Sequence, residues 1–293
     1  TKLIWLNLYR TKLTDAGLVH LEELTTLQNL DIRGTQITDA GLADIKGLTN
    51  LQTLWLGDTH ITDAGLAHLE DTNLKKLTIP KQAKTDIGLK HYLAAVESLK
   101  TLSLNSWQIT DAGLEHLKGL TGLKELRLPK QITDSGLVHL KGMTNLQTLY
   151  LSATQVTDAG LVHLAGMKLK TLTIPKQART DIGLKHYLAA MERQWHLDLT
   201  DWKITEAGLV YLNGLTSLQE LYLYKLTISD AGLVHLKGLS GLRRLGLNGP
   251  TITDAGLMHL VELTNLTFLD IKNTPITDAG FAELQKALPN CEI

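Results

Sequence analysis

Carboxylates recur at one fixed position along this 293-residue chain and could bind a metal ion or cap helices. The acidic residue of a Thr-Asp-Ala-Gly-Leu motif, or a close variant, occurs twelve times, from Asp15 to Asp278, with Glu206 in one copy. A calcium site needs several oxygen ligands within one loop, and each motif offers one carboxylate. A carboxylate that follows a threonine N-cap stabilises the positive end of a helix. We therefore predict helix capping and no metal site.

Histidines form a second column. Nine of the eleven follow the glycine and leucine of the motif at the same position: His20, His68, His91, His116, His139, His163, His186, His235 and His259. They precede an inward leucine, so we expect them on the outer face of the helices. Such a ladder could sense pH or bind a metal, but adjacent helices are too far apart for most pairs to share an ion. We interpret the column as a consensus residue copied by duplication.

Lysines form a third column, directly after the strands of alternate repeats: Lys81, Lys130, Lys176 and Lys225. Strands of one sheet lie about 4.8 Å apart, so these lysines would stand roughly 10 Å from each other and could attract an acidic partner. Asp58 and Asp201 occupy the same position in other repeats, and the formal net charge is −1. We interpret the row as a solvated edge that discourages sheet pairing, and we predict no nucleic-acid partner.

The sequence carries no catalytic motif of the GxSxG, P-loop, HExxH or CxxC type, and no GxGxxG after a strand. His196 and Asp198 share a predicted strand, but no serine or cysteine nucleophile stands beside them. We predict that the protein is not an enzyme and needs no cofactor. The single cysteine, Cys291, cannot form an intrachain disulfide, and its inward strand position predicts a buried apolar residue.

These columns exist because the chain is a tandem repeat. The motifs begin 23, 24 or 25 residues apart, and periods of this size indicate a stacked solenoid. In residues 27–48, Leu30 and Ile32 have strand spacing, whereas Leu42 and Ile45 have the spacing of an α- or 3₁₀-helix. Each repeat therefore predicts a strand, a turn, a short helix with a threonine N-cap, and a return loop.

The pattern LxxLxLxxTxITDAGLxxLxxLTN resembles the leucine-rich repeat family over essentially the whole chain. The ITDAGL segment is most similar to the cysteine-containing subtype of F-box substrate adaptors and to bacterial repeat proteins. The resemblance implies an α/β leucine-rich repeat solenoid, a horseshoe with a concave parallel β-sheet and short convex helices. It also implies a polar ladder in the loops, here made by Thr11, Thr35, Thr59, Thr154 and Thr274. The chain departs from that ladder at Trp107, Trp202, Leu226 and Pro250, and three shorter turns offer Gln82, Gln131 and Gln177.

We predict a single domain over residues 1–293, made of about twelve repeats and a terminal strand stub at 288–293. The sequence also has a second, longer period, because residues 78–97 recur at 173–192, four repeats later. We interpret this as duplication of a four-repeat block, inherited or designed, without a function of its own.

The outward strand positions vary from repeat to repeat, whereas the inward leucines barely change. The family resemblance implies that this concave face binds the ligand, and aromatic residues and arginines often anchor interfaces. The predicted binding residues are Trp5, Tyr9, Trp55, Arg127, Tyr150, His196, Asp198, Tyr222, Tyr224, Arg244 and Phe268. One patch would lie near Tyr150, Tyr222 and Tyr224, and another near Trp5, Tyr9 and Trp55. The alternative is that aromatic residues simply suit strands.

We therefore predict a non-enzymatic scaffold that binds a protein or peptide on its concave face. Two alternatives stay open: a recognition or regulatory segment of a larger multidomain protein, and an engineered or consensus-like scaffold without an evolved partner. Self-association through the end strands is a further alternative. No apolar run approaches the roughly 20 residues of a membrane span. The single cysteine and the lack of a visible signal peptide favour the cytoplasm and leave secretion open.

Overall fold

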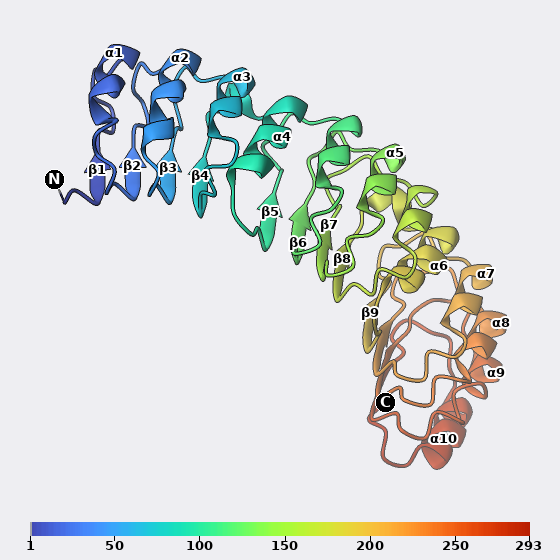
Figure 1. The fold of residues 1–293 in the computed structure, drawn as a ribbon. Coiled ribbons are helices and arrows are strands. Elements are labelled where there is room, and N and C mark those ends of the chain that lie inside the picture. The colour runs from blue at the N-terminus through green and yellow to red at the C-terminus, as the bar shows by residue number, and fades with distance from the viewer. Residues whose placement is uncertain (1) are drawn as a thin grey trace. The chain divides into compact units, whose positions relative to one another are not determined.

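The computed structural model describes residues 2–293, which form two compact units that meet between Gln155 and Val156. In both units, each repeat runs from a three-residue strand to a helical segment and back, so that strands form one layer and helices the other (Figure 1). This confirms the predicted α/β architecture of parallel strands and short helices.

The strands of unit 1 are β1 (Trp5–Asn7), β2 (Asn29–Asp31), β3 (Thr53–Trp55), β4 (Lys76–Thr78), β5 (Thr101–Ser103), β6 (Glu125–Arg127) and β7 (Thr148–Tyr150). Those of unit 2 are β8 (Thr171–Thr173), β9 (His196–Asp198), β10 (Glu220–Tyr222), β11 (Arg244–Gly246) and β12 (Phe268–Asp270). Neighbouring strands pair in parallel within β1–β4, within β5–β7 and within β9–β12.

The α-helices are α1 (Asp15–Leu18), α2 (Asp39–Leu42), α3 (Asp63–Leu66), α4 (Asp86–Ala95), α5 (Asp134–Leu137), α6 (Asp181–Ala190), α7 (Glu206–Leu209), α8 (Asp230–Leu233), α9 (Asp254–Leu257) and α10 (Asp278–Ala287). The 3₁₀-helices are η1 (Val19–Leu21), η2 (Ala43–Gly47), η3 (Ala67–Leu69), η4 (Lys81–Ala83), η5 (Ala112–Leu117), η6 (Val138–Leu140), η7 (Gly160–Leu164), η8 (Lys176–Ala178), η9 (Val210–Leu212) and η10 (Val234–Leu236). Among residues 2–293, no helix has both the length and the apolarity to cross a bilayer.

The sheet is interrupted within each unit, where we expected continuous pairing. β4 and β5 are not paired, and neither are β8 and β9; single bridges, Leu74 with Val96 and Leu169 with Met191, stand nearby. Both interruptions follow the duplicated segment. There the helix is a ten-residue α-helix, α4 or α6, instead of a four-residue turn continued by a 3₁₀-helix. The longer helix changes the path of the chain into the next strand.

The core of each unit is a stack of leucines in register. The central leucine of each paired strand lies beside the central leucine of the next, as with Leu30 and Leu54 in unit 1 and Leu221 and Leu245 in unit 2. All four side chains are fully buried. Cys291 is also buried, as predicted, and burial followed by the charge of Glu292 raises the pKa of its thiol.

The acidic residue of one motif binds the threonine of the next motif within each unit. Asp39 accepts hydrogen bonds from the backbone N–H and the hydroxyl of Thr62, both at 2.6 Å. Asp181 accepts the same pair from Thr205, at 2.8 and 2.6 Å. Hydrogen bonds from the hydroxyl and then the backbone N–H of Thr277 lower the pKa of Asp254. These bonds hold each repeat against its neighbour.

Our expectation that capping and the helix dipole fully account for the Thr-Asp pair is therefore wrong in part. The threonine stands at the N-cap position, but its side chain accepts a capping bond only at Thr85, Thr180, Thr253 and Thr277 among the described α-helices. At Thr38, Thr62, Thr133 and Thr205 the hydroxyl donates instead to the carboxylate of the preceding repeat. One repeat read alone could not show this, because the acceptor belongs to its neighbour.

The glycine of the motif leaves room for that carboxylate. A Cβ built on Gly65 would overlap Oδ1 and come close to Cγ of Asp39, and one on Gly208 would do the same with Asp181. The loop threonines form the polar ladder that the family resemblance implied. The hydroxyl of Thr35 donates to the carbonyl of Ile32 at 2.6 Å, and Thr11, Thr59, Thr154 and Thr274 do the same within their own loops.

We predict that Gly65→Ala destabilises the protein by about 1–3 kcal/mol, since the new methyl group would overpack against Asp39. The matched control is Gly238→Ala, where the Cβ would meet no heavy atom within 4 Å; its effect should stay within about 0.5 kcal/mol. Urea unfolding of both variants measures the difference. Equal unfolding midpoints for the two would contradict this explanation of the glycine.

Candidate functional site

The candidate site is the outward face of the strands. Side chains alternate across a strand, so the first and third residues of each strand point away from the buried central leucine, as the burial of β3 and β10 shows.

Two tryptophans meet on unit 1. Trp5 on β1 stacks with Trp55 on β3, with ring centroids 5.9 Å apart and an interplanar angle of 29°. Trp5 remains 59% exposed. The ammonium of Lys76 on β4 lies 5.7 Å from the centroid of Trp55. The structure thus brings together two of the three residues of the predicted N-terminal patch and adds a cation to them.

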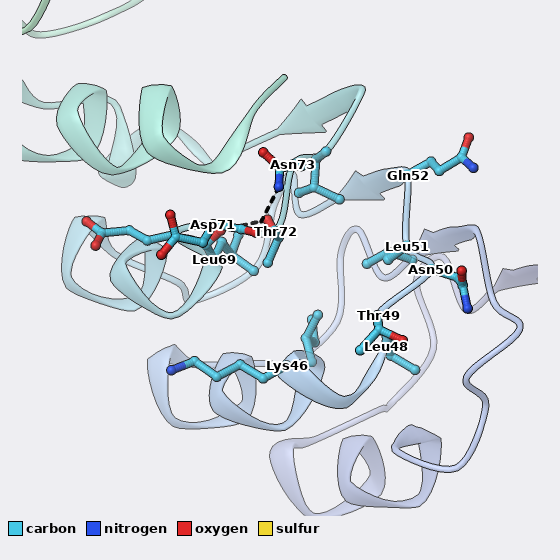
Figure 2. Close-up of a pocket in the computed structure, with 13 residues that line it drawn as sticks. Lys46, Leu48, Thr49, Asn50, Leu51, Gln52, Leu69, Asp71, Thr72 and Asn73 are labelled. Atoms are coloured by element: carbon cyan, nitrogen blue, oxygen red, sulfur yellow. Dashed lines mark hydrogen bonds between the residues drawn. The ribbon is translucent and has the colours of Figure 1, made fainter. Parts of the chain in front are cut away.

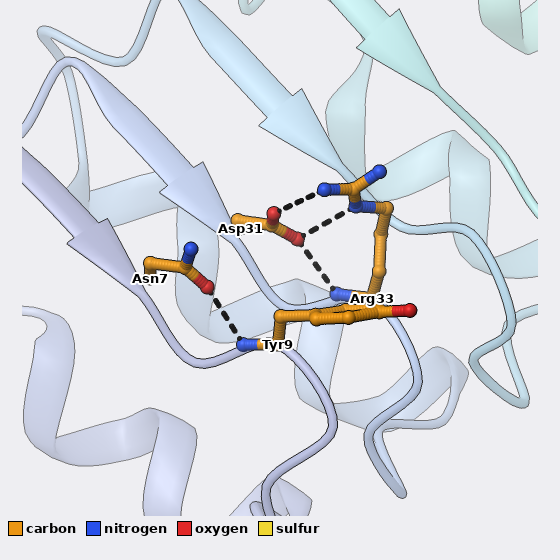
Figure 3. Close-up of polar contacts among 4 residues, drawn as sticks. All are labelled: Asn7, Tyr9, Asp31 and Arg33. Atoms are coloured by element: carbon orange, nitrogen blue, oxygen red, sulfur yellow. Dashed lines mark hydrogen bonds and ion pairs between the residues drawn. The ribbon is translucent and has the colours of Figure 1, made fainter.

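Tyr9, the third member of that patch, lies between two arginines. The guanidinium carbons of Arg10 and Arg33 are each 5.1 Å from its ring centroid. Figure 3 shows Arg33 held in place by Asp31, which accepts bonds from Nε at 2.9 Å and from Nη2 at 2.6 Å. Arg33, chiefly through its side-chain hydrogen bonds, lowers the pKa of Asp31. Tyr9 is therefore part of a charged aromatic cluster.

Tyr150 carries a cation of its own. The guanidinium of Arg127 on β6 lies 3.7 Å from the Tyr150 ring centroid on β7, and Arg127 also binds Glu125 at 3.1 Å. The residues of the predicted patch belong to different units: Tyr150 stacks with Arg127 in unit 1, whereas Tyr222 and Tyr224 stack with each other in unit 2.

An aromatic row runs along the face of unit 2. Consecutive ring centroids in the row Trp195, His196, Tyr222 and Tyr224 are 5.5, 5.7 and 5.9 Å apart. His196 Nδ1 also lies 3.0 Å from Glu220 Oε2. Trp195 is absent from the predicted binding residues, although it is 60% exposed, because it precedes the strand pattern used to choose them.

Tyr224 is fixed at the end of this row. Its hydroxyl donates to Asp270 Oδ2 at 3.1 Å. Burial, followed by the hydrogen bond and the charge of Asp270, raises the pKa of Tyr224 to about 12. A Cβ on Gly246 of β11 would overlap Cζ and Oη of Tyr224, so glycine is needed there for the ring to lie across the strand. Sequence reasoning missed Asp270 and Gly246 as members of the site.

The remaining predicted residues lie beside the row. Arg244 stacks on Phe268, with its guanidinium carbon 5.5 Å from the ring centroid. Asp198 is exposed and accepts one hydrogen bond, from the backbone N–H of Thr200 at 2.9 Å. Each predicted binding residue therefore has a described position, and their role in binding stays a prediction.

Few side chains of the histidine and lysine columns contact an acidic residue. His91 Nδ1 lies 2.6 Å from Glu70 Oε1, and Lys225 pairs with Asp201 at 3.1 Å. Burial, followed by the charge of Lys185, lowers the pKa of His186. Among residues 2–293, no group of three or more histidine, cysteine or acidic side chains is placed to hold a metal ion.

A cavity of about 650 Å³ lies away from the strand face, between the return loops at 45–52 and 69–74 of unit 1 (Figure 2). Part of its polar lining is already engaged, because Asn73 Nδ2 donates to the Asp71 carbonyl at 3.3 Å and the Thr72 hydroxyl to the Leu69 carbonyl at 2.6 Å. None of the predicted binding residues lines it.

Comparison with known families connects this architecture to one group of proteins. Residues 25–68 match the family model described as Leucine Rich repeats (2 copies), and residues 142–165 and 262–284 match one described as Leucine Rich repeat. No curated protein matches the sequence.

Several solved structures are similar to this chain. An internalin (inlF) from Listeria monocytogenes is similar, with 23% identity and a TM-score of 0.50, over 99% of this chain and 86% of that one. A leucine-rich repeat protein of Leptospira interrogans has 19% identity and a TM-score of 0.48, over 100% and 81%. TLR13, solved as a complex with ssRNA13, has 20% identity and a TM-score of 0.41, over 94% and 43%. At these identities the likeness concerns the fold alone.

We predict that Tyr224 ionises near pH 12 and that Asp270→Asn lowers this pKa, since the negative charge that disfavours the phenolate is removed. Phenolate absorbance during an alkaline titration measures it, and Tyr224→Phe identifies the signal that belongs to Tyr224. An unchanged titration in Asp270→Asn would contradict the contact.

Proposed function

We propose that this chain, a leucine-rich repeat protein, is a non-enzymatic scaffold that binds a protein or peptide through the outward face of its strands. Proteins of this family are generally binding scaffolds. The observation that carries the proposal is the concentration of aromatic rings on this face, with Trp5 59% exposed, together with Trp195, 60% exposed, which contacts His196 at the start of β9. Exposed tryptophans leave a large apolar area in water, which a partner would bury.

The charges on the face favour a polypeptide over a nucleic acid. A nucleic-acid surface needs a continuous stripe of lysines and arginines facing phosphates. Here Arg33 and Arg127 are each paired with a carboxylate, Asp31 and Glu125. The strand face therefore combines aromatic anchors with charges of both signs, as protein interfaces do.

The sheet also supplies a rigid base for these anchors. The two outward side chains of each strand flank one buried central leucine, and paired strands hold neighbouring anchors in fixed register. A preorganised face loses little conformational freedom on binding. The repeat core can keep this geometry while the outward residues differ.

We predict that peptides selected from a phage-displayed random library on the wild-type protein bind the strand face. At least one of Trp55→Ala, Tyr150→Ala and Tyr222→Ala should weaken the selected peptides about tenfold or more, because aromatic anchors dominate interface energy. Isothermal titration calorimetry of each variant measures the loss.

The matched control is Tyr211→Ala, which removes a half-buried tyrosine of η9, outside the strand face. It should leave the affinity within about twofold, below the size of a hot-spot effect. Selected peptides that bind all three face variants as tightly as the wild type would refute the strand face as the binding surface.

A further inference from the structure

The two copies of the duplicated block differ where the aromatic row begins. Residues 78–97 and 173–192 are nearly identical, but the next four residues change from Ser98-Leu99-Lys100-Thr101 to Arg193-Gln194-Trp195-His196. A lysine and a threonine of the first copy are thus an exposed tryptophan and a histidine in the second. The divergence falls on the break between β8 and β9.

Gln194 is an unusual residue for its position. It stands where the repeat has a core leucine, and it is only 8% exposed. Its Nε2 donates to the His196 carbonyl at 2.8 Å, while its Oε1 has no hydrogen-bond partner among residues 2–293. Gln194, Trp195 and His196 line a cavity of about 200 Å³. A buried acceptor without a donor is unfavourable in the free protein, and the Tyr187 side chain, which also lines this cavity, lies near Gln194.

Three aromatic rings on the face of unit 1 have a lysine or arginine of the protein itself stacked on them, whereas the aromatic row of unit 2 has none among residues 2–293. In unit 1, Tyr9, Trp55 and Tyr150 each have an arginine or lysine within 5.7 Å of the ring centroid. In unit 2, no lysine or arginine of the described chain stacks on the row Trp195, His196, Tyr222 and Tyr224. Counted by strands from the duplicated segment, Tyr222 takes the place of Arg127, and Gly246 that of Tyr150.

The second copy keeps the glutamate of the first copy, although the arginine that paired with it is replaced by Tyr222. Glu125 pairs with Arg127 in the first copy, whereas its counterpart Glu220 has a histidine beside it, with Oε2 3.0 Å from His196 Nδ1. Asp198 adds a second carboxylate, directly beside Tyr222 on the adjacent strand, where side chains are about 5 Å apart. Part of the rise in the pKa of Tyr224 comes from Asp270 and Asp198, in keeping with a negative potential here.

The basic side chains nearby each have a contact within the protein. Arg244 stacks on Phe268, Lys272 lies 3.4 Å from Asp270, and Lys225 pairs with Asp201. Lys170 and Arg193 line the same cavity as Trp195. Their positive charges disfavour a ligand cation in that cavity. Tyr222 has no such neighbour stacked on it among the described residues and is the ring on which a ligand cation can lie.

We propose that the row His196, Tyr222 and Tyr224 receives an arginine or lysine side chain of a peptide partner, stacked on Tyr222 between Asp198 and Glu220. This rests on the proposed function and specifies the chemistry of the partner. A cation over a tyrosine face is attracted by the ring quadrupole, and the two carboxylates supply charge-assisted hydrogen bonds.

The test uses fluorescein-labelled hexa-arginine and hexa-lysine, with hexa-glutamate and hexa-serine as reference peptides, and fluorescence anisotropy at low salt. The wild type should bind the basic peptides and neither reference peptide. Tyr222→Arg, which restores the residue of the first copy, should weaken hexa-arginine about tenfold or more. Asp198→Ser, which restores the counterpart Ser103, should weaken it severalfold.

Charge-matched control variants distinguish binding at Tyr222 from a general electrostatic attraction between the peptide and the protein. Tyr211→Arg adds the same charge outside the strand face, and Glu262→Gln removes one charge at an exposed position of a return loop. Both should keep the affinity within about twofold, and circular dichroism melts establish that every variant is folded. Equal weakening in the variants and their controls, or no binding of the basic peptides to the wild type, would overturn the proposal.

The outcome is distinguishable from a failure of the proposed function. Library peptides that need Tyr222 but carry no arginine or lysine would overturn the cation site and leave the scaffold function standing. Library peptides that bind independently of the strand face would refute the scaffold proposal even if hexa-arginine bound at Tyr222.

Discussion

The carboxylate of one repeat that binds the threonine of the next is the contact on which the architecture depends. It explains why threonine, acid and glycine recur together: the threonine donates, as Thr62 does to Asp39, and the glycine leaves the space that the carboxylate occupies. A single repeat buries too little surface to offset its ordering entropy, so stability comes from contacts between neighbours. The motif and the leucine stack supply these contacts. The residue types at the outward strand positions are therefore not constrained by stacking.

In the scaffold function that we propose, the residues that determine binding are those whose type the leucine stack and the motif do not constrain. Unit 1 places its own arginines or lysine on Tyr9, Trp55 and Tyr150, as in the pair of Arg127 and Tyr150. Unit 2 keeps the carboxylate Glu220 but has Tyr222 in place of the arginine. One block, duplicated, thus carries two different surfaces on the same framework. Such local departures from a repeating rule are where functional sites are expected.

Much of the fold follows from the sequence because the period is regular. Leucine spacing predicted the strands and helices, and the family resemblance implied the ladder that Thr35 and its equivalents form. The binding of Asp39 to Thr62 escaped prediction because it joins residues of different repeats. The aromatic residues of the face were predictable from strand alternation, but their pairing was not, because it depends on ring orientation. Trp195 lay outside the strand pattern, although the divergence of the two copies marked it.

A double-mutant cycle at Asp39 and Thr62 tests the central contact most directly. Asp39→Ala, Thr62→Val and the double variant are compared with the wild type by urea unfolding. If the carboxylate–threonine contact joins the repeats, the coupling free energy is about 1–2 kcal/mol, as expected for a hydrogen bond to a charged group. Losses that simply add, with no coupling, would contradict the account, since each residue would then stabilise only its own repeat.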